Sequence, residues 1–171
     1  DLPCIALRQD AAQDLAVLPN ETMDVPLELF SLFSFIQRKV EKHPRQNLRL
    51  RVKLPGMYSI AENEFIMADV LSLSMEGLFF KTAARLKECD RLTVVFPLLG
   101  QCTEIEVTST VLYSIEPGPE NNYFQGFGVG FDEIPEQHSQ KLRTFIRDCF
   151  LKEVSSSQNA VGDFVREHLK D

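Results

Sequence analysis

The feature that most limits the fold is a series of short runs in which apolar and polar residues alternate, between residues 48 and 131. This period of two is typical of half-buried strands. Six strands are predicted, at 48–54, 65–73, 77–82, 92–99, 104–114 and 123–131. Turn-forming residues separate them, at 55–56, 75–77, 87–90, 100 and 116–119. Because no long helical pattern interrupts the series, we expect an all-β core of six antiparallel strands, as a barrel or sandwich.

Helical periodicity flanks the predicted strands. From Pro26 to about Lys42, apolar residues recur at helical spacing in a stripe wider than a lone surface helix needs. Two shorter stripes follow at 142–150 and 161–169, and the Ser-rich segment 155–159 between them is interpreted as a linker. We therefore expect an N-terminal extension with an amphipathic helix (1–44), a barrel (45–134) and C-terminal helices (135–171). The wide stripe favours a homodimer, or the docking of a partner protein, through the N-terminal helix.

Composition excludes several classes of protein. The net charge of −7 argues against a binder of nucleic acid polymers. No apolar run approaches the roughly 20 residues of a membrane span, and residues 1–20 lack the features of a secretory signal. Four scattered cysteines favour reduced, buried thiols in a cytoplasmic protein. Residues 45–54 hold four basic residues and no acid, which on charge alone is most simply a solvated strand face.

No pattern supports catalysis or a cofactor. His43, His138 and His168 all lie outside the predicted strands, and no local signature pairs any of them with a serine or cysteine nucleophile. No group of residues has the ligand spacing of a metal site. The glycines in GFGVGF, at 126–131, lack the strand–turn–helix setting of a dinucleotide loop. We therefore expect a protein that is not an enzyme, with no catalytic residues, metal or cofactor.

Two motifs give the barrel a more specific interpretation. Arg45-x-x-x-Arg49 lies at the start of the first predicted strand, and Ser72-x-Ser74-x-x-Gly77 lies at a strand–turn–strand junction. With these motifs in this order, and with the GFGVGF ending of the last strand, residues 45–150 resemble the PilZ family of bacterial cyclic di-GMP receptors. That resemblance implies a six-stranded antiparallel barrel followed by a helix, and a role in second-messenger signalling such as motility or biofilm regulation.

The resemblance also implies a ligand site. Arg45 and Arg49 would clasp cyclic di-GMP against the barrel, since an arginine fork meets guanine O6 and N7, or a phosphate, bidentately. Ser72, Ser74 and Gly77 would complete the site, with Gly77 leaving room for the ligand. Arg51 is a further candidate for a phosphate contact.

One position departs from the family pattern. The family has Asp or Asn where this chain has Ser72, and a hydroxyl makes at most one contact with a guanine edge. In a regular strand Asp69 would face the opposite side and would be a poor substitute. The alternative is a degenerate PilZ module that does not bind nucleotide and acts as a protein-interaction adaptor or oligomeriser.

Overall fold

The computed structural model describes residues 6–8, 22–40, 47–61 and 64–168, in two compact units formed by residues 1–48 and 49–171. The first unit contains two short parallel strands, β1 (Ala6–Arg8) and β2 (Thr22–Asp24), and helix α1 (Leu29–Val40). The helix begins three residues after Pro26 because Glu28 caps it. The Glu28 carboxylate accepts hydrogen bonds from the backbone N–H and the hydroxyl of Ser31, both at 2.8 Å.

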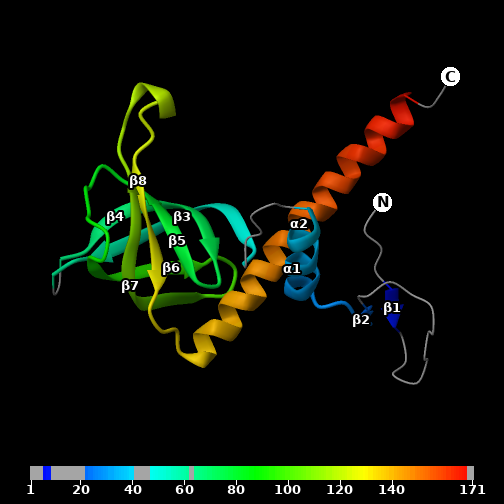
Figure 1. Cartoon of the computed structure of the whole chain (residues 1–171), viewed down its shortest axis with the longest axis horizontal. Coiled ribbons are helices and arrows are strands. Elements are labelled where there is room, and N and C mark those ends of the chain that lie inside the picture. Colours follow the sequence, from blue (N-terminus) through cyan, green and yellow to red (C-terminus); the bar gives the residue numbers. More distant parts are fainter. Residues whose placement is uncertain (1–5, 9–21, 41–46, 62–63, 169–171) are drawn as a thin grey trace. The chain divides into compact units, whose positions relative to one another are not determined.

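The second unit is a closed six-stranded antiparallel barrel, which confirms the predicted fold (Figure 1). The order around the barrel is β3-β4-β5-β8-β7-β6. A 3-10 turn, Pro119–Asn121, precedes the last strand. The strands are β3 (Arg49–Ser59), β4 (Ile66–Ser74), β5 (Gly77–Lys81), β6 (Arg91–Leu98), β7 (Thr103–Ile115) and β8 (Gly126–Phe131).

Alternate residues of every strand fill the barrel with large apolar side chains. Three aromatic rings meet at its centre. Tyr58 lies 5.1 Å from Phe127, edge to face, and 5.5 Å from Phe80, and all three side chains are fully buried. Such pairs each add about 0.5–1.5 kcal/mol beyond their apolar burial. The predicted alternation therefore corresponds to a real inner and outer face.

The first barrel strand is longer than the sequence indicates, because Pro55 and Gly56 lie within β3 and do not form a turn. At Pro55 the strand pairs with Asp69 of β4, whereas its pairing with β6 covers only 57–59. On the side of β3 that faces β6, Pro55 lies outside the paired residues, so its missing N–H costs no hydrogen bond between strands there. Gly56 is buried, and a Cβ there would lie 2.8 Å from both Phe80 and Val70.

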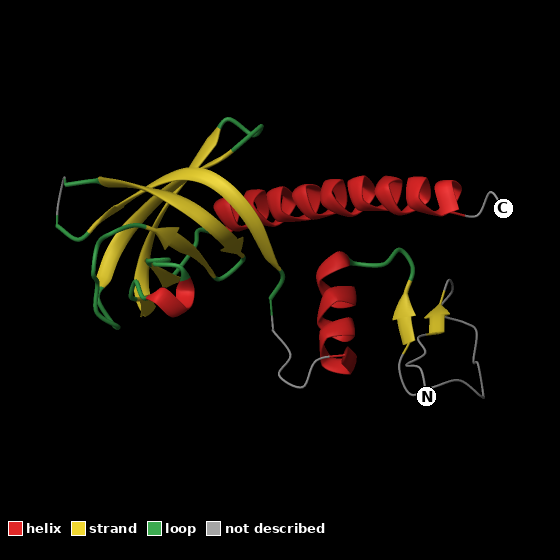
Figure 2. Cartoon of the chain, turned by 90° about the horizontal axis from the view of Figure 1, so that it is seen from above, coloured by secondary structure: helices red, strands yellow, loops and turns green. Residues whose placement is uncertain are grey.

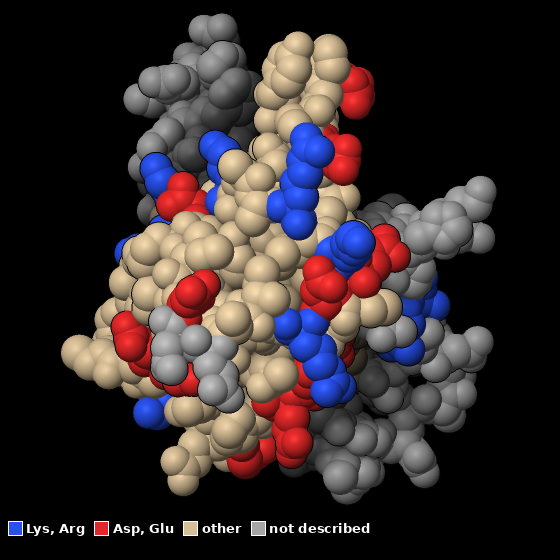
Figure 3. Space-filling model, turned by 90° about the vertical axis from the view of Figure 1, so that its left-hand side faces the viewer, with Lys and Arg blue, Asp and Glu red and all other residues tan. Residues whose placement is uncertain are grey.

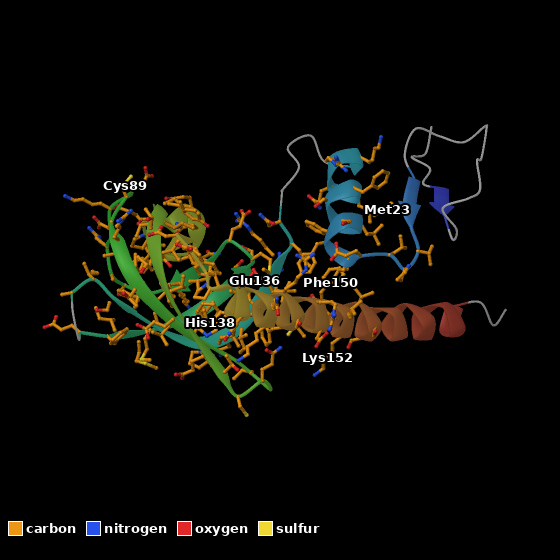
Figure 4. The ribbon with its side chains drawn as sticks, turned by 90° about the horizontal axis from the view of Figure 1, so that it is seen from below. Met23, Cys89, Glu136, His138, Phe150 and Lys152 are labelled. Atoms are coloured by element: carbon orange, nitrogen blue, oxygen red, sulfur yellow. The ribbon has the colours of Figure 1, made fainter. Side chains whose placement is uncertain are left out.

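Helix α2 (Glu136–His168) follows the barrel and packs its first turns on it. Leu142, Phe145 and Ile146 are buried there, and the Lys141 ammonium donates to the Thr103 hydroxyl at 3.3 Å. The helix then runs away from the barrel (Figure 2), and Figure 4 shows Phe150 and Lys152 further along it than Glu136 and His138.

The linker predicted at 155–159 is wrong, since α2 continues through it as one helix. The Ser155 and Ser156 hydroxyls donate to the carbonyls of Leu151 and Lys152, both at 2.8 Å. Both hydroxyls therefore find hydrogen-bond acceptors within the helix, which allows the helix to continue. Among the described residues, none of the helices combines the length and the apolar character that crossing a bilayer requires.

Two cysteines differ from the prediction of buried thiols. Cys89 and Cys102 are exposed, at left-handed turn positions (φ 70° and 48°) just before β6 and β7. Figure 4 shows Cys89 at the edge of the barrel. Cys149 on α2 is half-buried and free, and burial, aided by the Asp148 charge, raises the pKa of its thiol. Cys4 lies outside the described residues.

Candidate ligand-binding face of the barrel

The strand register aligns five residues in one row across the outside of the barrel. We call this the outer row: Arg51 of β3, Ser72 of β4, Phe79 of β5, Gly128 of β8 and Tyr113 of β7. Neighbours in the row sit on adjacent strands, about 4.8 Å apart. Leu50 and Leu73, which pair next to Arg51 and Ser72, are buried in the core, so the row faces outward.

Arg49 lies beside this row, directly opposite Ser74. Arg49 and Arg51 are both exposed on the same side of β3, two residues apart. The register therefore places each of these arginines opposite one serine of the second motif. Arg45, the first residue of the arginine motif, lies outside the described residues.

Ser74 and Gly77 both have roles in the fold itself. The buried Ser74 hydroxyl donates to the Gly77 carbonyl at 3.0 Å and accepts from the Glu76 N–H at 3.3 Å, which holds the β4–β5 turn. A Cβ on Gly77 would collide with the Val129 carbonyl oxygen of β8. Strand packing therefore requires this glycine whether or not a ligand is present.

Ser72 is half-buried between Arg51 and Phe79, and within the described part of the chain its hydroxyl has no hydrogen-bond partner. The strand is irregular next to it, because its pairing shifts between Val70 and Ser72. This bulge changes the alternation of faces. Val70 is buried, and Asp69 pairs with Lys81 on the outside of the barrel. The expectation that Asp69 faces away from Ser72 is therefore wrong.

An aromatic surface that the motifs do not indicate adjoins Ser72. We call Phe79, Tyr113 and Phe124 the aromatic shelf. The Phe79 ring stacks on Phe124 at 5.4 Å and on Tyr113 at 6.2 Å, with interplanar angles of 13° and 26°. These rings cover the outer face of β8, where a Cβ at Gly126 or Gly128 would strike them. The alternating glycines of GFGVGF were the sequence signal for this surface.

The exposed charges do not form one broad basic surface on the face seen in Figure 3. There, the described Lys and Arg side chains lie among Asp and Glu side chains, with large uncharged areas between them. Arg49 and Arg51 are both exposed, and each guanidinium carries a planar fork of hydrogen-bond donors. Donors of this kind suit a small anion with a defined shape better than a polyanion.

Three solved structures share this fold. Bacillus subtilis MotI/DgrA, an inhibitor of motility, aligns with 64% of the chain and 52% of its own length, at 18% identity and TM-score 0.57. The PilZ domain of Escherichia coli YcgR, solved with c-di-GMP, aligns with 68% of the chain and 98% of the domain, at 14% identity and TM-score 0.53.

The third is a tetrameric PilZ protein of Xanthomonas campestris that self-assembles through a helical bundle. It aligns with 63% of the chain and 89% of its own length, at 9% identity and TM-score 0.50. The alignment spans about half of MotI/DgrA, and of E. coli YcgR in its longer c-di-GMP complex. No curated protein matches the chain. The PilZ domain model matches residues 42–148, well over half of the sequence, so the chain belongs to the PilZ domain family.

Proposed function

We propose that this protein is a receptor for cyclic di-GMP, bound on the outer face of β3, β4 and β5. The observation that carries the proposal is the pairing of Arg49 with Ser74 and of Arg51 with Ser72. It brings Arg49 of the first motif opposite Ser74 of the second, with Arg51 and Ser72 beside them on the outer side of the barrel. The YcgR PilZ domain, which shares the fold, was solved with the same ligand.

Each group has a chemical role in this proposal. Arg45 and Arg49 clasp the ligand, each offering a planar fork of donors to guanine O6 and N7 or to a phosphate. Arg51, two residues further along the exposed side of β3, contacts a phosphate. Ser72 offers one hydroxyl beside them, while Ser74 and Gly77 shape the turn. The aromatic shelf next to Ser72 limits the ligand's position on that side.

The protein acts by binding and not by catalysis, as a cytoplasmic effector in second-messenger signalling. The ligand stays intact, and its capture changes how the protein's other parts engage a target. The competing function is an adaptor whose nucleotide site has been lost, and Ser72 is the feature that favours it. Arg49 and Arg51 favour the receptor, because two exposed guanidinium groups opposite the serine motif suit the binding of a nucleotide.

We also propose that α1 mediates assembly, with a second copy of the chain as its partner. Ile36 of α1 is 44% exposed, and Leu27, just before the helix, is 40% exposed. Burying large apolar side chains stabilises an interface by about 1.5–3 kcal/mol each. The X. campestris PilZ protein shows that this fold is compatible with helix-mediated assembly.

Isothermal titration calorimetry tests the receptor function directly. Cyclic di-GMP is titrated into the full chain, and GMP serves as the control for a generic guanine or phosphate contact. A micromolar or lower Kd for cyclic di-GMP, with much weaker binding of GMP, supports the receptor. Absence of heat at millimolar ligand would overturn it in favour of the adaptor.

A further inference from the structure

The strands that form the candidate site contain a single acidic residue. Strands β3, β4, β5 and β8 carry no Glu, and Asp69 of β4 is their only Asp. The arginine and lysine side chains on these strands are donors without acceptor capacity. Asp69 is therefore the only carboxylate on these four strands that can accept a hydrogen bond from a ligand.

The bulge in β4 places Asp69 on the outer side of the barrel, the same side as Ser72. Asp69 is exposed and lies in register with Pro55 of β3 and Lys81 of β5, in the row next to the outer row. It is three residues from Ser72, at most about 10 Å along the strand. Within the described residues no ion pair or hydrogen bond engages its carboxylate, although Lys81 is its cross-strand neighbour.

Guanine needs such an acceptor. Its O6 and N7 accept hydrogen bonds, which arginine forks supply, but its N1–H and 2-amino group are donors that arginine cannot satisfy. The Ser72 hydroxyl accepts at one point only. A carboxylate accepts from N1–H and the 2-amino group together, and charge-assisted bonds of this kind are the strong ones.

We propose that Asp69, brought to the outer face by the β4 bulge, recognises the N1–H and 2-amino edge of one guanine. This inference rests on the proposed receptor function and names the residue that selects the base. Adenine presents an acceptor at N1 and has no 2-amino group. A carboxylate facing adenine therefore meets a lone pair, so Asp69 sets the preference for cyclic di-GMP over cyclic di-AMP.

The competing carboxylate is Glu76, in the β4–β5 turn. Its backbone N–H donates to Ser74 and its carbonyl accepts from Phe131, so its main chain is fixed as part of the turn. Glu76 lies just past the end of β4, whereas Asp69 lies within the strand, in the row next to the one that holds Ser72 and Phe79. A side chain on a rigid strand positions a base more precisely than one on a turn.

The test measures binding of both dinucleotides to the wild type and to the variants Asp69→Ala, Asp69→Asn and Glu76→Ala. Glu106→Ala, an exposed carboxylate on β7, is the matched control. We expect Asp69→Ala to weaken cyclic di-GMP binding at least about tenfold and to reduce the preference over cyclic di-AMP. Asp69→Asn should lie between, since an amide keeps one acceptor and adds a donor. Glu106→Ala should match the wild type.

The sign of the effect separates recognition from simple electrostatics. Removing a negative charge near a ligand with two phosphates would by itself strengthen binding of both dinucleotides. Weaker binding confined to cyclic di-GMP therefore requires a direct contact. Thermal melting of each variant checks the fold, and we expect no change because Asp69 is exposed.

The outcomes distinguish the two proposals. If the wild type binds neither dinucleotide, the receptor function itself fails. If the wild type binds cyclic di-GMP, and Asp69→Ala keeps both affinity and preference, the assignment of Asp69 is overturned while the receptor stands. Loss in Glu76→Ala alone would also overturn it and would move the role to the turn.

Discussion

Gly77 of β5 and Val129 of β8 lie so close that the Val129 carbonyl occupies the space a Gly77 side chain would need. Gly77 pairs with Gly130, where the nearest atom to an added Cβ belongs to the Leu112 side chain, at 3.3 Å. We therefore expect Gly77→Ala to lower the free energy of unfolding by about 1–3 kcal/mol, and Gly130→Ala to cost less. Urea denaturation without ligand measures both. Equal stability of Gly77→Ala and the wild type would contradict this close approach.

The arginine motif gives the second prediction. Arg45→Ala and Arg49→Ala should each weaken cyclic di-GMP binding by at least about tenfold, and Arg→Lys should restore little, because an ammonium cannot form the bidentate contact. Lys53→Ala is the control, since Lys53 is an exposed cation on the same strand. Calorimetry provides the affinities. A loss in Lys53→Ala as large as in the arginine variants would indicate a general charge effect.

Ser72 provides a gain-of-function prediction. Ser72→Asn adds an amide between Arg51 and Phe79 in the outer row and should tighten cyclic di-GMP binding, by roughly 5–150-fold for one good polar contact. Ser72→Asp should do the same less cleanly, because its charge would also sit near the ligand phosphates. If neither variant gains affinity in calorimetry, the ligand does not reach Ser72.

The packing of α2 on the barrel gives a stability prediction. Ile146 is fully buried, so Ile146→Ala should cost about 2–5 kcal/mol in the free energy of unfolding. Leu151, five residues further along the same helix, is 48% exposed, and Leu151→Ala should change stability by less than about 0.5 kcal/mol. Chemical denaturation that gave equal effects for the two would show that α2 does not pack as described.

Sedimentation equilibrium tests assembly through α1. The wild type should sediment at micromolar concentration as a species heavier than the 19.5 kDa monomer. Phe33→Glu, which places a charge in the apolar stripe of α1, should shift it towards the monomer while the circular dichroism spectrum stays unchanged. A wild type that remains monomeric would exclude the dimer.

The six strands were predictable because each buries one face, and burial of one face imposes a period of two. The pattern fails where geometry departs from the regular strand. Regular alternation puts Asp69 on the wrong face, because the bulge at Val70–Ser72 leaves no trace in the residue types. The pair Pro55-Gly56 predicts a turn by residue type, whereas β3 tolerates Pro55 because its pairing with β6 does not extend to that residue.

The continuity of α2 and the aromatic shelf likewise could not be predicted from local sequence patterns. The serines at 155–156 favour a break on propensity alone, yet their hydroxyls bond back to the helix carbonyls. Phe79 and Tyr113 are 34 residues apart in the sequence and come together only through the order β5-β8-β7. Local pattern predicts elements, whereas contacts between distant strands are set by topology.

The continuity of α2 has a mechanical consequence. A helix of 33 residues is about 50 Å long and resists bending, so it transmits angular motion along its whole length. Its first turns pack on the barrel through the buried side chains of Leu142 and Ile146, so a rigid tilt of the helix would pivot near these residues. His168 lies 22 residues beyond Ile146, about 33 Å along the helix, so a tilt of about 5° there displaces that end by roughly 3 Å. A change in strand packing that tilted these turns would therefore be magnified towards the far end of α2.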